Sequence, residues 1–237
     1  MPSTLPTHPL AVLPLKLWRP RWFDGVALAT GACAPDFAYA LDGFGVTIRS
    51  HTVPAMFWWG LPTAVLAAWL ARLGAPVVAA HLPSLLRDFG VLGRVRHRWF
   101  VTVWSALIGV ASHLLFDLVT HPGPVAAWYQ IRRASDGWAV LLTPLFLWYI
   151  GRRRLLRDWH GPAPEVPRAP LAFWGVAVGV TALGFVATWL LGYHGVHVLG
   201  VRLMTSAAVG LLCASAALQW ARAAGDRPSR PAPVPPG

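Results

Sequence analysis

The chain has 237 residues, of which 56% are hydrophobic and only 12% are charged, and its mean hydropathy is +0.51. This composition excludes a disordered chain and argues against an ordinary soluble domain, because soluble domains carry about 25% charged residues. Twenty basic residues against nine acidic ones give a formal net charge of +11. The basic residues form short clusters between apolar runs, as topology signals do, so nucleic-acid binding is not expected.

The apolar stretches predict the elements. The segment before residue 53 is less apolar than the rest and predicts short helices that lie in the membrane interface. A helix that crosses a bilayer needs about 20 apolar residues, and five stretches come close to this length. They are residues 53–71, 99–120, 134–151, 169–193 and 203–221. The predicted fold is therefore all-α, a polytopic transmembrane helix bundle of about five spans.

The same stretches divide the chain. Residues 1–151 hold three spans and the His and Asp residues considered below, and 171–222 hold two further helices. Residues 152–170 are a linker rich in Pro and Arg, and 223–237 form a Pro-rich tail that we expect to be disordered, since it has no apolar face to bury. Gly175 and Gly179 form a GxxxG pair that permits close helix approach, although such a pair also arises by chance in a Gly-rich chain.

The arginine distribution predicts the orientation. When the basic residues are assigned to alternate sides of the five spans, thirteen fall on one side and seven on the other. The side with thirteen is expected to be cytoplasmic and to hold the C-terminus, with the N-terminal region outside. In this assignment Arg72 belongs to the first cytoplasmic loop and Lys16 lies outside.

Ionisable residues at membrane depth are the most informative ones, because such a group in hydrocarbon costs several kcal/mol unless it is paired or bound. In SHLLFDLVTH, the residues His113, Asp117 and His121 recur every four positions and share one helix face. Successive members are about 6 Å apart, the reach at which an imidazole and a carboxylate can share a metal ion. Pro122 ends the helix, so His121 either folds back to support the ligands or faces an adjacent ion.

Three further residues are expected to join this face. The predicted topology places His51, which precedes the first span, at the same side of the membrane. His8 stands before a proline that suits a first helical turn, and Asp36 follows a proline in a turn rich in Gly and Ala. The candidate metal ligands are His8, Asp36, His51, His113, Asp117 and His121, and the candidate catalytic carboxylates are Asp36 and Asp117.

The order of these motifs resembles a known family. The segments MPSTLPTHPLAVLPL, GACAPDFAYALDGFG, RSHTVPAMFWWGLP and SALIGVASHLLFDLVTHPG, with a weaker WYQIRRASDGW, are similar to an uncharacterised family of bacterial membrane proteins, domain of unknown function 4184. The pattern is also similar to the LexA-regulated membrane-bound metal-dependent hydrolases. More distantly, it resembles zinc-dependent phospholipase C and the S1/P1 nucleases, helical enzymes that cleave phosphoesters. Those soluble enzymes have a second HxxxD motif, which this sequence lacks.

The resemblance implies metal-ligand roles for five residues and a bacterial cell membrane as the location. The five are His8, Asp36, His51, His113 and Asp117. Mixed His and Asp ligation suits Zn²⁺, with Mn²⁺ and Fe²⁺ as alternatives, and one or two ions are expected. Such an ion lowers the pKa of a bound water towards about 7 and polarises a phosphoryl oxygen. Membrane lipid is the expected partner, and a small or lipid-like phosphoester is the expected substrate.

Three classes of function fit these residues. The first is a metal-dependent hydrolase that acts on a phosphoester or lipid at the outer membrane face. The second is a non-catalytic membrane protein in which the His and Asp cluster, with or without a metal, holds helices together. The third is a transporter or proton relay, which predicts polar groups throughout the membrane depth, whereas the last two spans offer only His197 and Arg202 near one end. We therefore favour the first class and keep the second as the alternative.

Overall fold

The computed structural model describes residues 4–190, 192 and 195–225, and every element in these ranges is helical. The first elements are α1 (Thr4–Val12), α2 (Pro14–Trp18), α3 (Gly25–Cys33) and the 3₁₀-helix η1 (Asp36–Leu41). The π-helical turn η2 (Met56–Gly60), α4 (Leu61–His81), the 3₁₀-helix η3 (Ser84–Gly93) and α5 (Trp99–Thr120) follow. The last are α6 (Trp128–Arg152), α7 (Leu155–His160), α8 (Pro170–Leu190) and α9 (Val196–Gly225). From residue 226 on, the tail expected to be disordered lies outside the described residues.

Four helices of the described chain are long and apolar enough to cross a membrane, which confirms the predicted helical bundle. They are Met56–His81, Trp99–Thr120, Pro170–Leu190 and Val196–Ala224. Helix α6, which contains the predicted span 134–151, has comparable length but carries Arg132, Arg133 and Asp136 in its first half. Large apolar side chains such as Leu66, Trp69 and Val178 are exposed, as a surface in contact with lipid requires.

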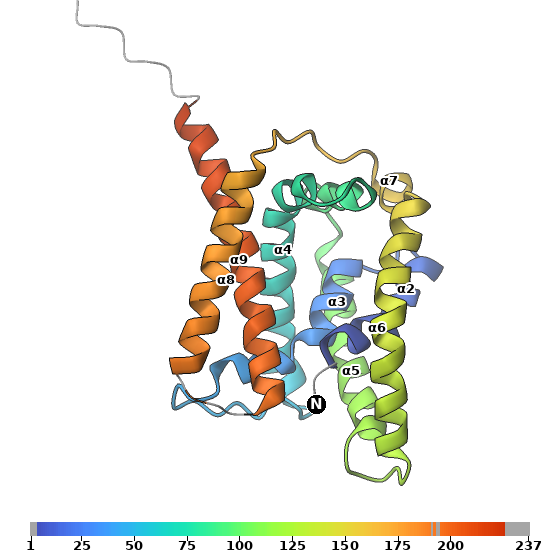
Figure 1. Ribbon diagram of the computed structural model, residues 1–237. Helices are drawn as coiled ribbons and strands as arrows, with labels where there is room; N and C mark the ends of the chain where they lie inside the picture. The colour runs from blue at the N-terminus through green and yellow to red at the C-terminus, as the bar shows by residue number, and fades with distance from the viewer. Residues whose placement is uncertain (1–3, 191, 193–194, 226–237) are drawn as a thin grey trace, which may run out of the picture.

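The long helices run from one end of the bundle to the other (Figure 1). Helices α4, α6 and α9 run towards the end where η3 and α7 lie, and α5 and α8 run away from it. We call this end, with residues 82–98 and 153–169, the arginine end. The opposite end holds residues 42–55 and 121–127 and is called the histidine end. The two arginine-rich connections thus lie at the same end, as the alternating spans predicted.

The N-terminal helices form a hairpin within the bundle. The chain runs from His8 to Lys16, whose Nζ lies 5.4 Å from the centre of the Trp159 ring beside the arginine end. The ammonium then donates to the carbonyl oxygens of Pro20, at 2.6 Å, and Phe23, at 2.9 Å. These bonds stabilise a turn after which α3 returns towards the histidine end. The prediction that Lys16 lies on the side away from the arginine-rich loops is therefore wrong, because the chain doubles back before its first long span.

Two glycines let α3 and α5 approach closely. A Cβ added at Gly31 of α3 would lie 2.3 Å from the carbonyl oxygen of Ala106, and one added at Gly109 of α5 would lie 2.4 Å from that of Leu28. Any larger residue at either position would push the two backbones apart. This contact determines where the end of α3 lies relative to the polar face of α5.

Of the two alternatives for the GxxxG pair in the fourth span, the structure favours chance over close helix approach within the chain. A Cβ at Gly175 or Gly179 would meet open space, so neither residue lies at a helix contact. The contact between α8 and α9 uses other glycines instead: a Cβ at Gly184 would lie 2.3 Å from Ser206 Oγ, and one at Gly210 would lie 2.5 Å from the carbonyl oxygen of Ala177.

A buried ion pair joins α3, α4 and α5. Asp24, which is 1% exposed, caps α3 by accepting from the backbone N–H groups of Val26 and Ala27, and it pairs with the Arg72 guanidinium. The hydroxyl of Thr102 donates to the same carboxylate at 2.8 Å. Burial alone would raise the pKa of Asp24, but Arg72 and the Thr102 hydrogen bond hold it below its ordinary value. Because α4 continues to His81, Arg72 lies inside a helix, and its prediction as a loop residue is wrong.

Candidate metal centre

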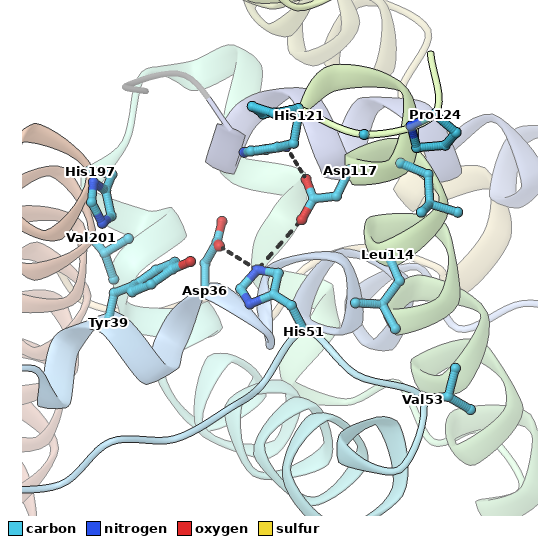
Figure 2. Close-up of a pocket in the computed structure, with 13 residues that line it drawn as sticks. Asp36, Tyr39, His51, Val53, Leu114, Asp117, His121, Pro124, His197 and Val201 are labelled. Atoms are coloured by element: carbon cyan, nitrogen blue, oxygen red, sulfur yellow. Dashed lines mark ion pairs between the residues drawn. The ribbon is translucent and has the colours of Figure 1, made fainter. Parts of the chain in front are cut away.

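Six side chains from four parts of the chain meet at the histidine end. Helix α1 contributes one, η1 another, the segment before η2 a third, and α5 with its C-cap the remaining three. They are His8, Asp36, His51, His113, Asp117 and His121, the residues that sequence reasoning selected as candidate ligands. Figure 2 shows four of them around one pocket, with His51 directed towards both carboxylates.

Each of two carboxylates in this cluster lies near the same two imidazole nitrogens, at distances typical of ligands around one ion. The Nε2 atoms of His51 and His113 are 3.2 Å apart. Asp36 Oδ1 lies 3.3 Å from the first nitrogen and 3.7 Å from the second, and Asp117 Oδ2 lies 3.5 and 3.3 Å from them. Tetrahedral ligands about 2.0–2.2 Å from a Zn²⁺ ion are about 3.3–3.6 Å from one another. The two nitrogens together with either carboxylate oxygen therefore suit the ligation of one cation.

The orientation of His113 is determined by the α3 backbone. Its Nδ1 lies 2.7 Å from the carbonyl oxygen of Ala32, an atom that can only accept a hydrogen bond. Nδ1 therefore carries a proton, and Nε2 is directed towards the cluster. The Nδ1 atom of His51 is similarly engaged, at 3.0 Å from the hydroxyl of Ser50. Both imidazoles thus present Nε2 to the carboxylates.

A second group of atoms surrounds the other oxygen of Asp117. Asp117 Oδ1 lies 3.2 Å from His121 Nδ1 and 3.6 Å from His8 Nε2. The His8 ring stacks on that of His113, with 3.8 Å between the centroids. Neither ring nitrogen of His8 has a hydrogen-bond partner, although the residue is 1% exposed, and Asp117 Oδ1 is also buried without one. Unpaired buried atoms of this kind are costly, which makes them candidates for metal ligation.

The ionisation of the two residues outside the long helices suits metal ligation. Burial, helped by the neighbouring His113, lowers the pKa of His8 to about 3, so its imidazole is neutral. Burial alone would raise the pKa of Asp36, but the hydrogen bond from His51 and the nearby imidazoles hold it below its ordinary value. A neutral imidazole and an ionised carboxylate are the forms that bind metal ions.

A cavity of about 460 Å³ adjoins the cluster. Its polar side is formed by Asp36, His51, Asp117 and His121, whereas Val53, Leu114, Leu118 and Val201 contribute apolar surface. The side chain of His113 is 1% exposed and that of His51 is 30% exposed. One side of the cluster is thus sealed by protein, and the other is open to the cavity.

Sequence reasoning missed Tyr39 and did not select His197 as a site residue. Both line the cavity, and their rings are in edge contact at 5.0 Å. In Figure 2 the hydroxyl of Tyr39 points towards Asp36. Burial and the Asp36 charge raise the pKa of Tyr39 to about 12, so its hydroxyl remains a hydrogen-bond donor. The signal in the sequence for Tyr39 is its spacing from Asp36, three positions earlier, because residues three apart in a 3₁₀-helix lie one above the other.

Comparison with known protein families gives a match over most of the chain. A family model matches residues 1–218, a range that includes all six residues of the cluster and all four long apolar helices except the end of α9. No curated protein and no solved structure matches the chain. The match confirms the family suggested by the His, PD, SHT and SHLLFD motifs and extends beyond the segments that carry them. The chain therefore belongs to the family described as Domain of unknown function (DUF4184).

Proposed function

We propose that the protein is a membrane hydrolase that uses one or two divalent ions, with Zn²⁺ preferred, to cleave a lipid-like or small phosphoester at the histidine end. One observation carries the proposal: His51 Nε2 and His113 Nε2 lie 3.2 Å apart, and each lies 3.3–3.7 Å from an oxygen of Asp36 and from one of Asp117, beside a cavity of about 460 Å³. A cluster that only joined helices would have no need of a cavity at its open side.

The donor set supports a metal. Two sets of three residues bring their ligand atoms within 4.8 Å of one another: one is His8, His113 and Asp117, and the other is Asp36, His51 and His113. Imidazole and carboxylate ligands suit Zn²⁺, and Mn²⁺ or Fe²⁺ are the alternatives. The two oxygens of Asp117 face different groups of nitrogens, which supports a bridging role for this carboxylate if two ions bind.

The residues of the chain have distinct roles in this proposal. A bound ion supplies a Lewis acid that polarises a phosphoryl oxygen and acidifies a water molecule. Hydrolysis adds the water oxygen to phosphorus, breaks the ester P–O bond and transfers a proton to the departing alcohol. The Oδ2 atom of Asp36, buried without a hydrogen-bond partner, is available to accept a proton from the attacking water. The hydroxyl of Tyr39 is available to donate a hydrogen bond to the phosphoester.

The lining of the cavity supports a substrate with an apolar part. Val53 and Leu118 line the cavity and are 67% and 54% exposed, and Leu118 belongs to a helix that is long and apolar enough to cross a membrane. An acyl chain could therefore leave the cavity along apolar surface while the phosphoester stays beside the His and Asp side chains.

The orientation belongs to the same proposal. The arginine end would face the cytoplasm of a bacterial cell together with the C-terminus, and the histidine end would face outside. The arginine-rich connections 82–98 and 153–169 support this orientation, and so does the position of Lys16 beside Trp159. A reporter fused to the C-terminus should be active in the cytoplasm, and an extracytoplasmic reporter would contradict the orientation.

The catalytic part is tested with purified full-length protein, loaded with Zn²⁺ and assayed on bis(p-nitrophenyl) phosphate and on a phospholipid in mixed micelles. Asp36→Asn removes the base, and its hydrolysis rate per bound Zn²⁺ should be lower by about 100-fold or more. Asp158→Asn, at an exposed carboxylate of the arginine end, should have no effect. A fully metal-loaded protein that hydrolyses neither substrate would favour the structural cluster instead.

A further inference from the structure

Two cavities lie at the other side of the bundle, near the arginine end, and share Val95 and His97 in their walls. The first has a volume of about 440 Å³ and is lined mainly by apolar side chains of α1, α2, α3, α6, η3 and α7, including Leu10, Leu147 and Trp159. The second has a volume of about 380 Å³. Both volumes lie in the range of about 300–1,000 Å³ that is common for ligand sites.

The second cavity is cationic. Arg72, Arg96 and His97 contribute to its lining, and Lys16 lies in the wall of the apolar cavity. Among the described residues that line the two cavities, Asp24 is the one carboxylate, and it is already paired with Arg72. The ion pair therefore cancels one positive charge and leaves those of Lys16 and Arg96 without an acidic counterpart in either wall.

Not every polar atom near the wall shared by the two cavities has a hydrogen-bond partner. Arg72 Nε is buried without a hydrogen-bond partner. His97 and His160 pack against each other with ring centroids 5.9 Å apart, and both line the apolar cavity. The site thus combines a long apolar compartment with an adjacent compartment that has unused hydrogen-bond donors and positive charge.

We propose that the paired cavities bind one anionic phospholipid of the surrounding membrane, with an acyl chain in the apolar cavity and the phosphate beside Arg96 and His97. The occupant follows from charge complementarity and from the position of the site in a bundle whose long helices are apolar enough to lie in lipid. A soluble anion would leave the apolar compartment empty, and an uncharged lipid would leave the cationic compartment without a partner. The site is separate from the His and Asp cluster and does not depend on the proposed hydrolase activity.

The test measures lipid retention by native mass spectrometry of the full-length protein in detergent. The protein is supplied with phosphatidylglycerol or phosphatidylcholine that carry identical acyl chains. Arg96→Gln should weaken phosphatidylglycerol binding by about fivefold. Arg94→Gln is the matched control, because this exposed arginine of the same segment lines neither cavity. Retention of the two lipids to the same extent, or equal effects of the two substitutions, would overturn the proposal.

A second pair of variants tests the acyl compartment. Leu147→Trp fills part of the apolar cavity and should reduce phosphatidylglycerol retention, whereas Leu145→Trp places the same ring on the exposed surface of α6 and should leave it unchanged. Both variants can be checked for folding by thermal unfolding. Oleate and inorganic phosphate, each added alone, should not displace bound phosphatidylglycerol at equal concentration. Displacement by either compound would assign the site to that compound rather than to a phospholipid.

Discussion

The Nε2 atoms of His51 and His113 lie 3.2 Å apart, although the two residues are separated by 62 positions in the chain. Because Nδ1 of His113 donates to the carbonyl oxygen of Ala32, its Nε2 is directed towards His51. The position of Ala32 depends in turn on the packing of α3 against α5. The geometry of the cluster is therefore coupled to contacts farther along α3, and these can be varied without touching a candidate ligand.

Gly109→Ala should disrupt the cluster through the backbone. The added Cβ would lie 2.4 Å from the carbonyl oxygen of Leu28 and would push α3 away from α5. We expect a loss of about 1–3 kcal/mol in the free energy of unfolding, measured in mixed micelles, together with weaker metal retention because Ala32 moves relative to His113.

Gly175→Ala is the matched control for this effect. Its Cβ would meet open space, and alanine is the better helix former, so stability should stay equal or rise by up to about 1 kcal/mol. A similar loss of stability in both variants would show that α3 and α5 do not depend on close approach at Gly109.

Asp24→Asn should destabilise the protein strongly. The substitution removes the partner of the Arg72 guanidinium and leaves a buried positive charge among α3, α4 and α5, at a cost of about 3 kcal/mol or more. Thermal unfolding would report the change, and Asp158→Asn, at an exposed carboxylate, should unfold as the wild type does. If Asp24→Asn were equally stable, the ion pair would not be what joins these helices.

The pH dependence of stability should reveal the burial of Lys16. Burial lowers its pKa from 10.5 to about 8. Between these values the unfolded chain binds more protons than the folded one, so stability rises with pH across this window. Below about pH 8 both states are charged and the penalty for burying the ammonium is fully present. Unfolding curves of wild type and Lys16→Met should therefore converge as the pH rises from 8 to 10.5, and a constant difference would contradict the prediction.

His8→Phe should show whether the two groups of atoms around Asp117 hold separate metal ions. Phenylalanine can retain the stacking on His113 but offers no ligand atom to Asp117 Oδ1. If two ions bind, elemental analysis should find one of them lost and the ion at Asp36, His51 and His113 retained. Unchanged metal content would show that His8 is not a ligand.

Local spacing explains why the sequence predicted much of the fold and of the cluster. The four-residue repeat of His113, Asp117 and His121 defines one helix face directly, and counting spans places His51 beside it. The hydropathy of the long stretches likewise indicates helices before any packing is considered. The helix face and the hydropathy depend on residues that are close in the sequence. The position of His51 depends only on successive spans running in alternate directions.

Contacts between distant residues explain the errors. Arg72 interrupts an apolar run and resembles a loop arginine until its partner Asp24, 48 positions earlier, is known. The reversal of the chain after Lys16 depends on carbonyl oxygens of a turn that has no apolar pattern. His197 joins the cavity because α9 packs against η1, a pairing that no periodicity encodes.

The metal content of the purified protein tests the central claim most directly. Elemental analysis of wild type, His113→Ala, Asp117→Asn and Asp158→Ala, each equilibrated with Zn²⁺ and then dialysed, should find one or two ions in wild type and in Asp158→Ala. His113→Ala and Asp117→Asn should lose most of the metal, and Asp117→Asn should remain folded because asparagine has nearly the same shape. Wild-type protein without stoichiometric metal, or undiminished metal in both cluster variants, would contradict the account.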